Sequence, residues 1–523
     1  MHLRTAIACA ALLGGTFVAL SGPTAQAATA RYEAETSPAV CTGAIESDWT
    51  GYSGSGFCNA TNATSGYAQF TVTSSAAGTA TVAVRFANGT TTARPANIIV
   101  NGTTVSTASF EGTGTWTGWT TKTLTVPVNS GSNTIRLSPT TATGLPNVDY
   151  LEATTPDGGT TPPASGALYV SPSGTAGAAG TIDAPTTLAS AIGKVSSGGT
   201  IYLRGGTYNH STTVTIPAGS NGTSSARTTL AAYAGETPVL NFSAQTEASS
   251  NRGLQLNASY WHIKGLVVER AGDNGIYVGG SNNVIERTVT RYNRDTGLQL
   301  GRMASTTPNS EWPANNLILS AESHDNADSD GEDADGFAAK LTTGSGNVFR
   351  YAVSHNNIDD GWDLYTKTDT GAIGPVTIED SLAYDNGTLS DGTTAGNGDR
   401  NGYKLGGDGI AVNHVVKRSI AFENGKHGFT FNSNPGTMTI SNNLSIANTE
   451  RNFNFDGGTS VFRNNTSCNS GSSDRYVGDA DSSNQFWSGT NGSRCSAYNG
   501  ALGWSFASNG TLVVTIGGTK VTL

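Results

Sequence analysis

Residues 348–364 read VFRYAVSHNNIDDGWDL, and this stretch decides the fold. It holds a short strand, a turn and a second short strand, and it is too short to bury its own apolar face. Similar units surround it along the chain. They occupy residues 284–300, 317–340, 377–387, 401–405, 415–431 and 439–455. Units of this length must stack on one another, so the repetition predicts a solenoid of parallel strands.

One asparagine recurs at the same place in successive units. The column comprises Asn293, Asn326, Asn357, Asn386, Asn424, Asn448 and Asn469. Asparagines stacked at a bend can hydrogen-bond along the stack and to the turn backbone, which satisfies groups that would otherwise be unpaired. Such a ladder is typical of parallel β-helices, and a structural role is preferred here to a catalytic one. We therefore predict an all-β protein whose main part is a right-handed parallel β-helix.

The composition agrees with this fold class. The 523 residues include 67 glycines and 3 methionines, and long helix-forming stretches of Ala, Glu, Lys and Leu are absent. Asp and Glu number 39 against 29 Lys and Arg, which argues against a nucleic-acid partner. An acidic protein can still bind an acidic polymer when a divalent cation bridges the two.

Residues 1–27 have the features of a secretory signal peptide. Arg4 precedes an apolar run over residues 6–20, and residues 25–27 read AQA, which is typical of a cleavage site. The apolar run is too short and too interrupted to span a membrane. We therefore expect a secreted, extracellular monomer that does not associate with membranes.

The cysteines predict two disulfides. Of the 5 cysteines, Cys9 leaves with the signal peptide, and the others form two local pairs, Cys41 with Cys58 and Cys468 with Cys495. Pairs of this kind in an exported protein are typical of disulfides. A zinc site would need clustered ligands at C-x-x-C spacing, which the sequence lacks.

The chain is expected to have two domains. Residues 154–166 read TTPDGGTTPPASG, a flexible linker with nothing to bury. The linker separates a small module, residues 30–153, from the β-helix, residues 167–523. Apolar and polar residues alternate in short runs of the small module, and Asn101-Gly102 marks a hairpin turn. A separate β-sandwich fits this pattern.

Aligning the units brings acidic residues together. Asp335 and Asp360 each stand just before the glycine that recurs in the units, and neighbouring strands lie about 4.8 Å apart. Asp359 and Asp363 flank Asp360 on its own coil. Four carboxylates at such spacing repel one another unless a cation lies between them. Calcium tolerates irregular carboxylate clusters better than magnesium does, so we prefer a calcium site to the alternative of solvent-facing or turn-capping aspartates.

Lys404 is expected one strand further on, in the same column as Asp363. It stands in Gly402-Tyr403-Lys404-Leu405-Gly406, and the flanking glycines allow a ligand to approach closely. A nearby cation would lower the pKa of this lysine and leave more of it neutral. A neutral amine beside a bound cation can abstract a proton from carbon, and this hypothesis competes with that of a solvated surface charge.

These segments resemble the family nine pectate lyases. The similar motifs are DADGF at 333–337, DDGWD at 359–363, GYKLGG at 402–407 and FNSNPG at 431–436. The resemblance implies that Asp335, Asp359, Asp360 and Asp363 hold a catalytic calcium and that Lys404 is the base. The expected substrate is polygalacturonate or another pectic polysaccharide, cleaved by β-elimination to 4,5-unsaturated products.

Two further residues and two alternatives stay open. Arg302 and Lys340 are candidate contacts for a substrate carboxylate. A polygalacturonase on the same fold would use paired carboxylates and a water, and it would form no unsaturated product. A non-catalytic, glycan-binding β-helix would also suit the repeats, and the placement of Lys404 would then be accidental.

The small module resembles carbohydrate-binding modules of family thirty-five. The similarity rests on YEAE at 32–35, NVDYL at 147–151, Asn88-Gly89 and two tryptophans. It implies a calcium held by Glu33, Glu35 and Asp149 and a sugar site near Trp116, Trp119 and Asn147. The alternative is that both tryptophans belong to the core of the sandwich. Plant cell-wall glycans are the expected partners of this module.

Overall fold

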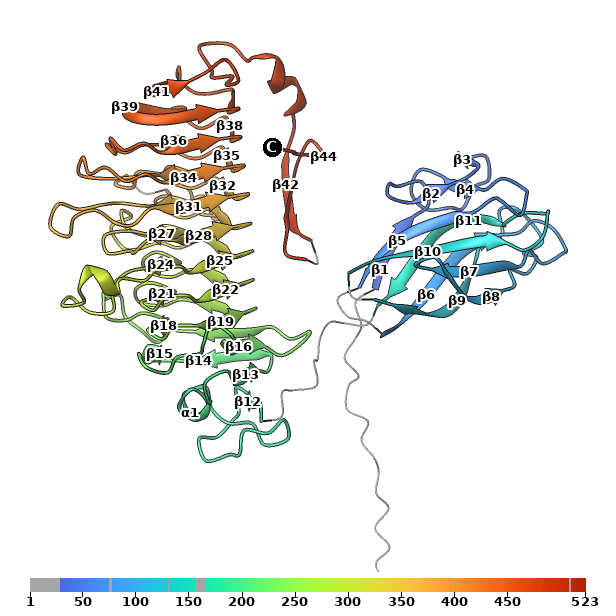
Figure 1. Cartoon of the computed structure of the whole chain (residues 1–523), viewed down its shortest axis with the longest axis horizontal. Helices are drawn as coiled ribbons and strands as arrows, with labels where there is room; N and C mark the ends of the chain where they lie inside the picture. The colour runs from blue at the N-terminus through green and yellow to red at the C-terminus, as the bar shows by residue number, and fades with distance from the viewer. Residues whose placement is uncertain (1–28, 75–77, 130, 156–165, 395, 508) are drawn as a thin grey trace, which may run out of the picture. The chain divides into compact units, whose positions relative to one another are not determined.

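The chain divides into two compact units, Met1–Asp157 and Gly158–Leu523 (Figure 1). The computed structural model describes residues 29–74, 78–129, 131–155, 166–394, 396–507 and 509–523. The predicted signal peptide and most of the predicted linker lie outside these residues. None of the described helices is long and apolar enough to cross a membrane.

The first unit is a β-sandwich of two antiparallel sheets, as expected from its alternating runs. Side chains from both sheets share one core, in which Phe70 and Val72 of one sheet lie with Val84 and Phe86 of the other. One sheet contains β1 (Thr29–Glu33), β3 (Ala44–Glu46), β4 (Phe57–Asn59), β6 (Gly78–Ala87), β9 (Thr120–Val128) and β11 (Asn147–Thr154). The other contains β2 (Val40–Cys41), β5 (Ala68–Ser74), β7 (Ala96–Val100), β8 (Thr103–Ala108) and β10 (Gly131–Pro139).

The second unit is a right-handed parallel β-helix, which confirms the predicted fold class. Each full coil contributes one short strand to each of three stacks. The first stack is β15 (Val214–Ile216), β18 (Leu254–Leu256), β21 (Ile276–Val278), β24 (Leu298–Leu300), β27 (Phe337–Ala339), β30 (Trp362–Asp363), β33 (Tyr403–Lys404), β36 (His427–Thr430) and β39 (Arg451–Arg463).

The second stack joins the first in one twenty-stranded sheet. It is β12 (Leu168–Val170), β13 (Thr200–Leu203), β16 (Thr228–Ala232), β19 (Trp261–Lys264), β22 (Val284–Glu286), β25 (Leu317–Leu319), β28 (Asn347–Arg350), β31 (Val376–Glu379), β34 (Val415–Lys417) and β37 (Thr439–Ser441), followed by the end of β39 and by β41 (Arg475–Ala480).

The third stack forms a sheet of its own. It is β14 (Gly206–Asn209), β17 (Pro238–Asn241), β20 (Val267–Glu269), β23 (Val289–Arg291), β26 (Glu322–His324), β29 (Val353–His355), β32 (Leu382–Tyr384), β35 (Ile420–Phe422), β38 (Leu444–Ile446) and β40 (Thr466–Cys468).

An aromatic column fills the coil beneath the first stack. The rings of Trp362 and Tyr403 are 4.8 Å apart, and those of Tyr403 and Phe429 are 4.6 Å apart. Phe453 continues the stack at 5.1 Å from Phe429. Because successive side chains of a strand point to opposite faces, these buried rings turn the residue after each of them outward. The aromatic column therefore sets the direction of the side chains that form the site.

The asparagine ladder is present, with one correction at its end. Asn293 donates through Nδ2 to Oδ1 of Asn326 at 2.9 Å, and the same bond recurs along the column as far as Asn448. Asn448 then donates to Asn452 at 2.7 Å. The prediction that Asn469 continues the ladder is wrong, because Asn452 takes that place and Asn469 pairs with Asn491 on the exposed side.

A helix covers the first coils of the stack, and the C-terminal segment covers one side of it. The helix α1 (Leu188–Lys194) packs Leu188, Ala191 and Ile192 into the core at the first coils. A C-terminal segment with β42 (Leu502–Phe506), β43 (Leu512–Ile516) and β44 (Thr519–Lys520) folds back along the third stack and shares an apolar cluster with it. Two short 3₁₀ helices, Asn309–Glu311 and Ser493–Ala497, lie in connections.

Candidate functional site

The register of the first stack places the predicted site residues in two columns. Ala338 of β27 lies beside Asp363 of β30, and Asp363 lies beside Lys404 of β33. At the turns that precede these strands, the backbone N–H of Asp360 donates to Asp335 at 3.3 Å. The alignment of the sequence units thus predicts the positions of these residues correctly.

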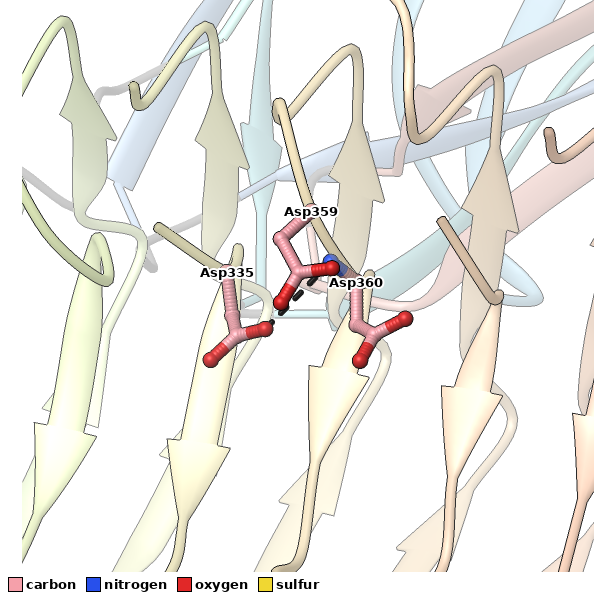
Figure 2. Close-up of side chains that lie close together, drawn as sticks. All are labelled: Asp335, Asp359 and Asp360. Atoms are coloured by element: carbon pink, nitrogen blue, oxygen red, sulfur yellow. Dashed lines mark hydrogen bonds between the residues drawn. The ribbon is translucent and has the colours of Figure 1, made fainter. Parts of the chain in front are cut away.

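Three of the four predicted calcium ligands form a buried carboxylate cluster. Asp335, Asp359 and Asp360 each offer an oxygen within 4.8 Å of the others, and Figure 2 shows them gathered on two adjacent coils. Asn401 donates to Asp360 through its backbone N–H at 2.6 Å and through its side chain at 2.9 Å. The backbone N–H of Asp399 donates to Asp359. These bonds hold the carboxylates in fixed directions.

Two oxygens of the site lack a hydrogen bond, which fits a cation. Asp360 Oδ2 and Asp363 Oδ1 are buried and accept no hydrogen bond from any residue that the structure describes. Asp360 Oδ2 lies 3.3 Å from Lys404 Nζ, in an ion pair without hydrogen-bond geometry. Buried carboxylate oxygens are ordinarily paired, because leaving one unpaired costs about 1–3 kcal/mol or more. Asp363 thus adds a fourth oxygen donor next to the cluster.

The electrostatics of the cluster also favour a cation. Burial, with the neighbouring carboxylates, raises the pKa of Asp335 and of Asp359 well above the usual range, although Lys340 opposes this effect at Asp335. Burial likewise raises the pKa of Asp360 to about 6, with Lys404 opposing this effect. Without a cation, the surroundings therefore disfavour full ionisation of the three aspartates. A bound divalent cation would offset both the cost of desolvating the carboxylates and the repulsion between them.

Lys340 lies inside the cluster. Its side chain is 10% exposed, and its Nζ lies 2.7 Å from Asp335 and 3.4 Å from Asp363. Arg302, the other residue expected to contact a substrate carboxylate, lies apart from the cluster. It lines a hollow of about 490 Å³ with Arg252, Tyr277 and other residues. The structure therefore joins Lys340, but not Arg302, to the aspartates.

Lys404 is held by three carboxylates. Its Nζ lies 3.0 Å from Asp399, 3.3 Å from Asp360 and 3.9 Å from Asp363. Burial lowers the pKa of Lys404, but the carboxylates of Asp363 and Asp360 outweigh burial and raise it above the ordinary value. The expected lowering of this pKa thus depends on a cation that neutralises the carboxylates.

Sequence reasoning missed two residues beside Lys404. Asp399 lies in the inserted loop that breaks the repeat, so no column of the alignment contains it. Tyr365 stands two residues after Asp363 and places its ring 5.6 Å from Lys404 Nζ. Its position on the same face as Asp363 was available from the period of a strand. With Lys340 and Asp359, these residues line a hollow of about 540 Å³.

The predicted calcium ligands of the small module surround one loop. Ser53 donates from Oγ to Glu33 at 2.7 Å, and Ser55 donates from its backbone to Glu35 at 2.8 Å. Asp149 accepts from Ser53 and from Arg85, the latter at 2.5 Å. Within the described residues, the Asp335 cluster alone brings three such groups within reach of one ion.

The predicted sugar-binding residues of the module differ in exposure. Trp116 and Trp119 are partly exposed and lie outside the buried core, so the interpretation as core residues is not supported. Trp119 donates from its indole to the backbone of Thr50 at 3.0 Å. Asn147 is buried. Both rings also have neighbours within the module: the Trp119 ring lies 5.3 Å from that of Phe57, and the guanidinium of Arg94 lies 5.3 Å from the Trp116 ring.

Both predicted disulfides are present. Cys41 bonds to Cys58, and Cys468 bonds to Cys495. The first links β2 to β4 within the sandwich, and the second ties β40 to the start of the C-terminal segment.

Fold and site together define a β-helix enzyme whose reactive groups stand on the outer face of the coil stack. Residues 168–466 match the family model described as Pel9A-like, right handed beta helix region, and the chain belongs to this family. A pectate lyase L of Paenibacillus polymyxa (strain SC2) is 58% identical over 341 residues, which cover 65% of this chain and 76% of that protein. The protein is a pectate lyase, and the predicted resemblance to family nine is confirmed.

Solved structures extend these similarities. The crystal structure of pectate lyase Pel9A has a TM-score of 0.54 and 32% identity, covering 62% of this chain and 81% of that one. Residues 29–155 match the family model of carbohydrate binding module family 6, which confirms a carbohydrate-binding module. A family 35 module from Clostridium thermocellum is 36% identical, with a TM-score of 0.24 over 25% of this chain and 99% of that one. Because the relatives of the β-helix are pectate lyases, the hydrolase and non-catalytic alternatives are set aside.

Proposed function

We propose that this protein is a secreted, monomeric, calcium-dependent pectate lyase that cleaves polygalacturonate by β-elimination. The observation that carries the proposal is the pair of buried oxygens, Asp360 Oδ2 and Asp363 Oδ1, that accept no hydrogen bond from the described residues beside Lys404. An acidic site is otherwise a poor place for an acidic polymer, since like charges repel. A cation bound by the aspartates would remove this conflict.

The residues that would hold calcium are Asp335, Asp359, Asp360 and Asp363. All four are buried oxygen donors, the kind of ligand that calcium prefers. Bound calcium would pair with the uronate carboxylate and make the adjacent C5 proton more acidic. Lys340 lies against two of these aspartates and keeps part of their charge compensated.

Lys404 is the proposed general base. Asp399 and Asp360 hold its Nζ at the floor of the hollow that Asp359, Asp363 and Tyr365 line. In its neutral form, the amine takes the C5 proton of the uronate. The C4–O4 bond then breaks, a 4,5 double bond forms, and the departing oxygen takes up a proton. The product is an unsaturated oligogalacturonide.

The N-terminal module is proposed to bind plant cell-wall glycans. Glu33, Glu35 and Asp149 would hold a calcium at the loop around Ser53, where Glu35 Oε2 is buried without a hydrogen-bond partner in the described part of the module. Trp116 and Trp119 would offer rings to a sugar, since aromatic faces stack on apolar sugar faces.

The experiment that tests the proposal is incubation with polygalacturonate, with and without a chelator. We expect ultraviolet absorbance from unsaturated uronides to rise, to stop on chelation and to resume on addition of calcium. Asp360→Ala should lose calcium affinity while the β-helix stays folded. Full activity in excess chelator, or cleavage without unsaturated products, would contradict the proposal.

A further inference from the structure

A second hollow adjoins the catalytic one on the side of the later coils. Its volume is about 240 Å³, and it shares Asp399 and Asn432 with the hollow around Lys404. The remaining lining residues are Asn401, Lys426, His427, Thr430, Phe431, Ser433 and Asn454. A polymer that lies along the stack over Lys404 would pass directly into this hollow.

The two columns of the catalytic site continue into the hollow and change character there. The column of Asp363 and Lys404 continues through Thr430 to Asn454. In the other column, the backbone N–H of His427 donates to Asn401 at 3.3 Å, so His427 follows Asn401. The carboxylates that suit a cation thus give way to neutral side chains that suit hydroxyl groups.

Two polar atoms in the hollow are buried without a partner. His427 Nδ1 and Asn454 Oδ1 make no hydrogen bond with any residue the structure describes. His427 is only 6% exposed, yet it lines the hollow. An unpaired buried polar atom costs about 1–3 kcal/mol, so both atoms are suited to a ligand that supplies the missing partner.

The charges of the hollow suit a uronic acid. Lys426 is partly exposed and is held at 2.9 Å from Asp399, which leaves ammonium protons free for a second carboxylate. Burial lowers the pKa of His427 to about 4. The imidazole is therefore neutral near neutral pH and can donate or accept a hydrogen bond.

We propose that this hollow is a subsite for the galacturonate unit next to the one over Lys404. His427 and Asn454 bind the hydroxyl groups of this unit, and Lys426 binds its carboxylate. The inference rests on the proposed function, since it takes polygalacturonate as the ligand.

The test measures binding of hexagalacturonate, with calcium present, to the full-length Lys404→Ala protein by calorimetry. Adding His427→Ala should weaken affinity about tenfold, the loss expected for a buried hydrogen bond to a ligand (about 1.4 kcal/mol). In the otherwise native enzyme, His427→Ala should raise KM about tenfold and change kcat much less. Lys426→Ala should also weaken binding of the hexamer.

His262→Ala is the matched control, because His262 lies on β19 of the same sheet and pairs with Glu286 at 2.9 Å, outside both hollows. His427→Gln, which keeps a hydrogen-bonding group, should recover part of the affinity. Equal affinity with and without His427 would overturn the subsite and leave the proposed function intact. No binding of hexamer by the Lys404→Ala protein would overturn both.

Discussion

The packing of its neighbours fixes both the direction of the Lys404 side chain and the place of its Nζ. Tyr403 is locked into the aromatic column, so Lys404 must point outward, where Asp399 and Asp360 fix its Nζ. A flexible lysine is thereby held at one point above the aspartates. The entropy of ordering this long side chain is lost on folding rather than on substrate binding.

Replacing Lys404 tests its role as the base. Lys404→Ala should lower turnover at least about a hundredfold, the usual scale for loss of a general base. Calcium affinity should survive, because the amine is not a ligand. Lys404→Arg should not restore activity, since a guanidinium stays protonated. Initial rates from ultraviolet absorbance and calcium titration measure both effects; turnover near that of the native enzyme in Lys404→Ala would assign the base elsewhere.

At this scale the sequence predicts the residues that sit in the repeat and misses those outside it. Asp335, Asp360 and Lys404 could be aligned because the recurring glycine directly follows the two aspartates and stands two residues before the lysine. Asp399 could not, because its loop has no counterpart in the other coils. Lys340 was expected to contact a substrate carboxylate. Residue spacing alone could not show that its long side chain turns back to pair with Asp335.

At the scale of the elements, the strands are short, and the asparagine ladder supplies hydrogen bonds at the bends where the strands end. The strand β30 has two residues, Trp362 and Asp363. Asn357 accepts from Asn326 at 2.8 Å and donates to Asn386 at 3.0 Å. Each ladder residue therefore satisfies polar groups on two neighbouring coils at the bend where the strands end.

Removing one ladder residue should reduce stability according to its place. Asn357→Ala removes the side-chain hydrogen bonds to both adjacent coils in a buried site. We expect a loss of about 2–4 kcal/mol in the free energy of unfolding, since a buried polar group that loses its partner costs about 1–3 kcal/mol. Asn469→Ala, at an exposed position beyond the ladder, should cost less than about 1 kcal/mol. Denaturant unfolding compares the two variants, and equal losses would refute the ladder's contribution.

The sequence predicts the strands because the unit repeats, and the prediction of the asparagine ladder is wrong at the last coils, where the repeat ends. Asn469 was assigned to the ladder by continuing the spacing of the earlier units. The final coils are shorter, however, and the ladder passes to Asn452 on the long strand β39. Extending the spacing of the ladder asparagines cannot show at which coil the ladder ends.

At the scale of the whole molecule, the two units have separate cores. The apolar cluster of the sandwich and that of the coil stack share no residue. Each unit thus has the apolar interior that an independently folding domain needs. The predicted boundaries of the module, residues 30–153, remain a proposal that truncation can test.

Deleting residues 30–153 should separate binding from turnover. Activity on soluble polygalacturonate should stay within about twofold, because the described residues that line the catalytic hollow all belong to the β-helix. Activity on insoluble plant wall should fall, since a tethered binding module raises the local concentration of substrate. Rates on the two substrates measure the difference, and equal losses on both would show that the module takes part in catalysis.

The C-terminal segment has a consequence for how the coil stack comes apart. Trp504 donates to the hydroxyl of Tyr384 at 3.0 Å, Ser320 donates to the carbonyl of Gly510 at 2.5 Å, and the Cys468–Cys495 bond anchors the start of the segment. A stack of repeats ordinarily frays from its outermost coil inward. Here the C-terminal segment runs from the last coil and is bound to coils in the middle of the stack. We therefore expect that heat or a protease releases this segment before the coils unfold one after another.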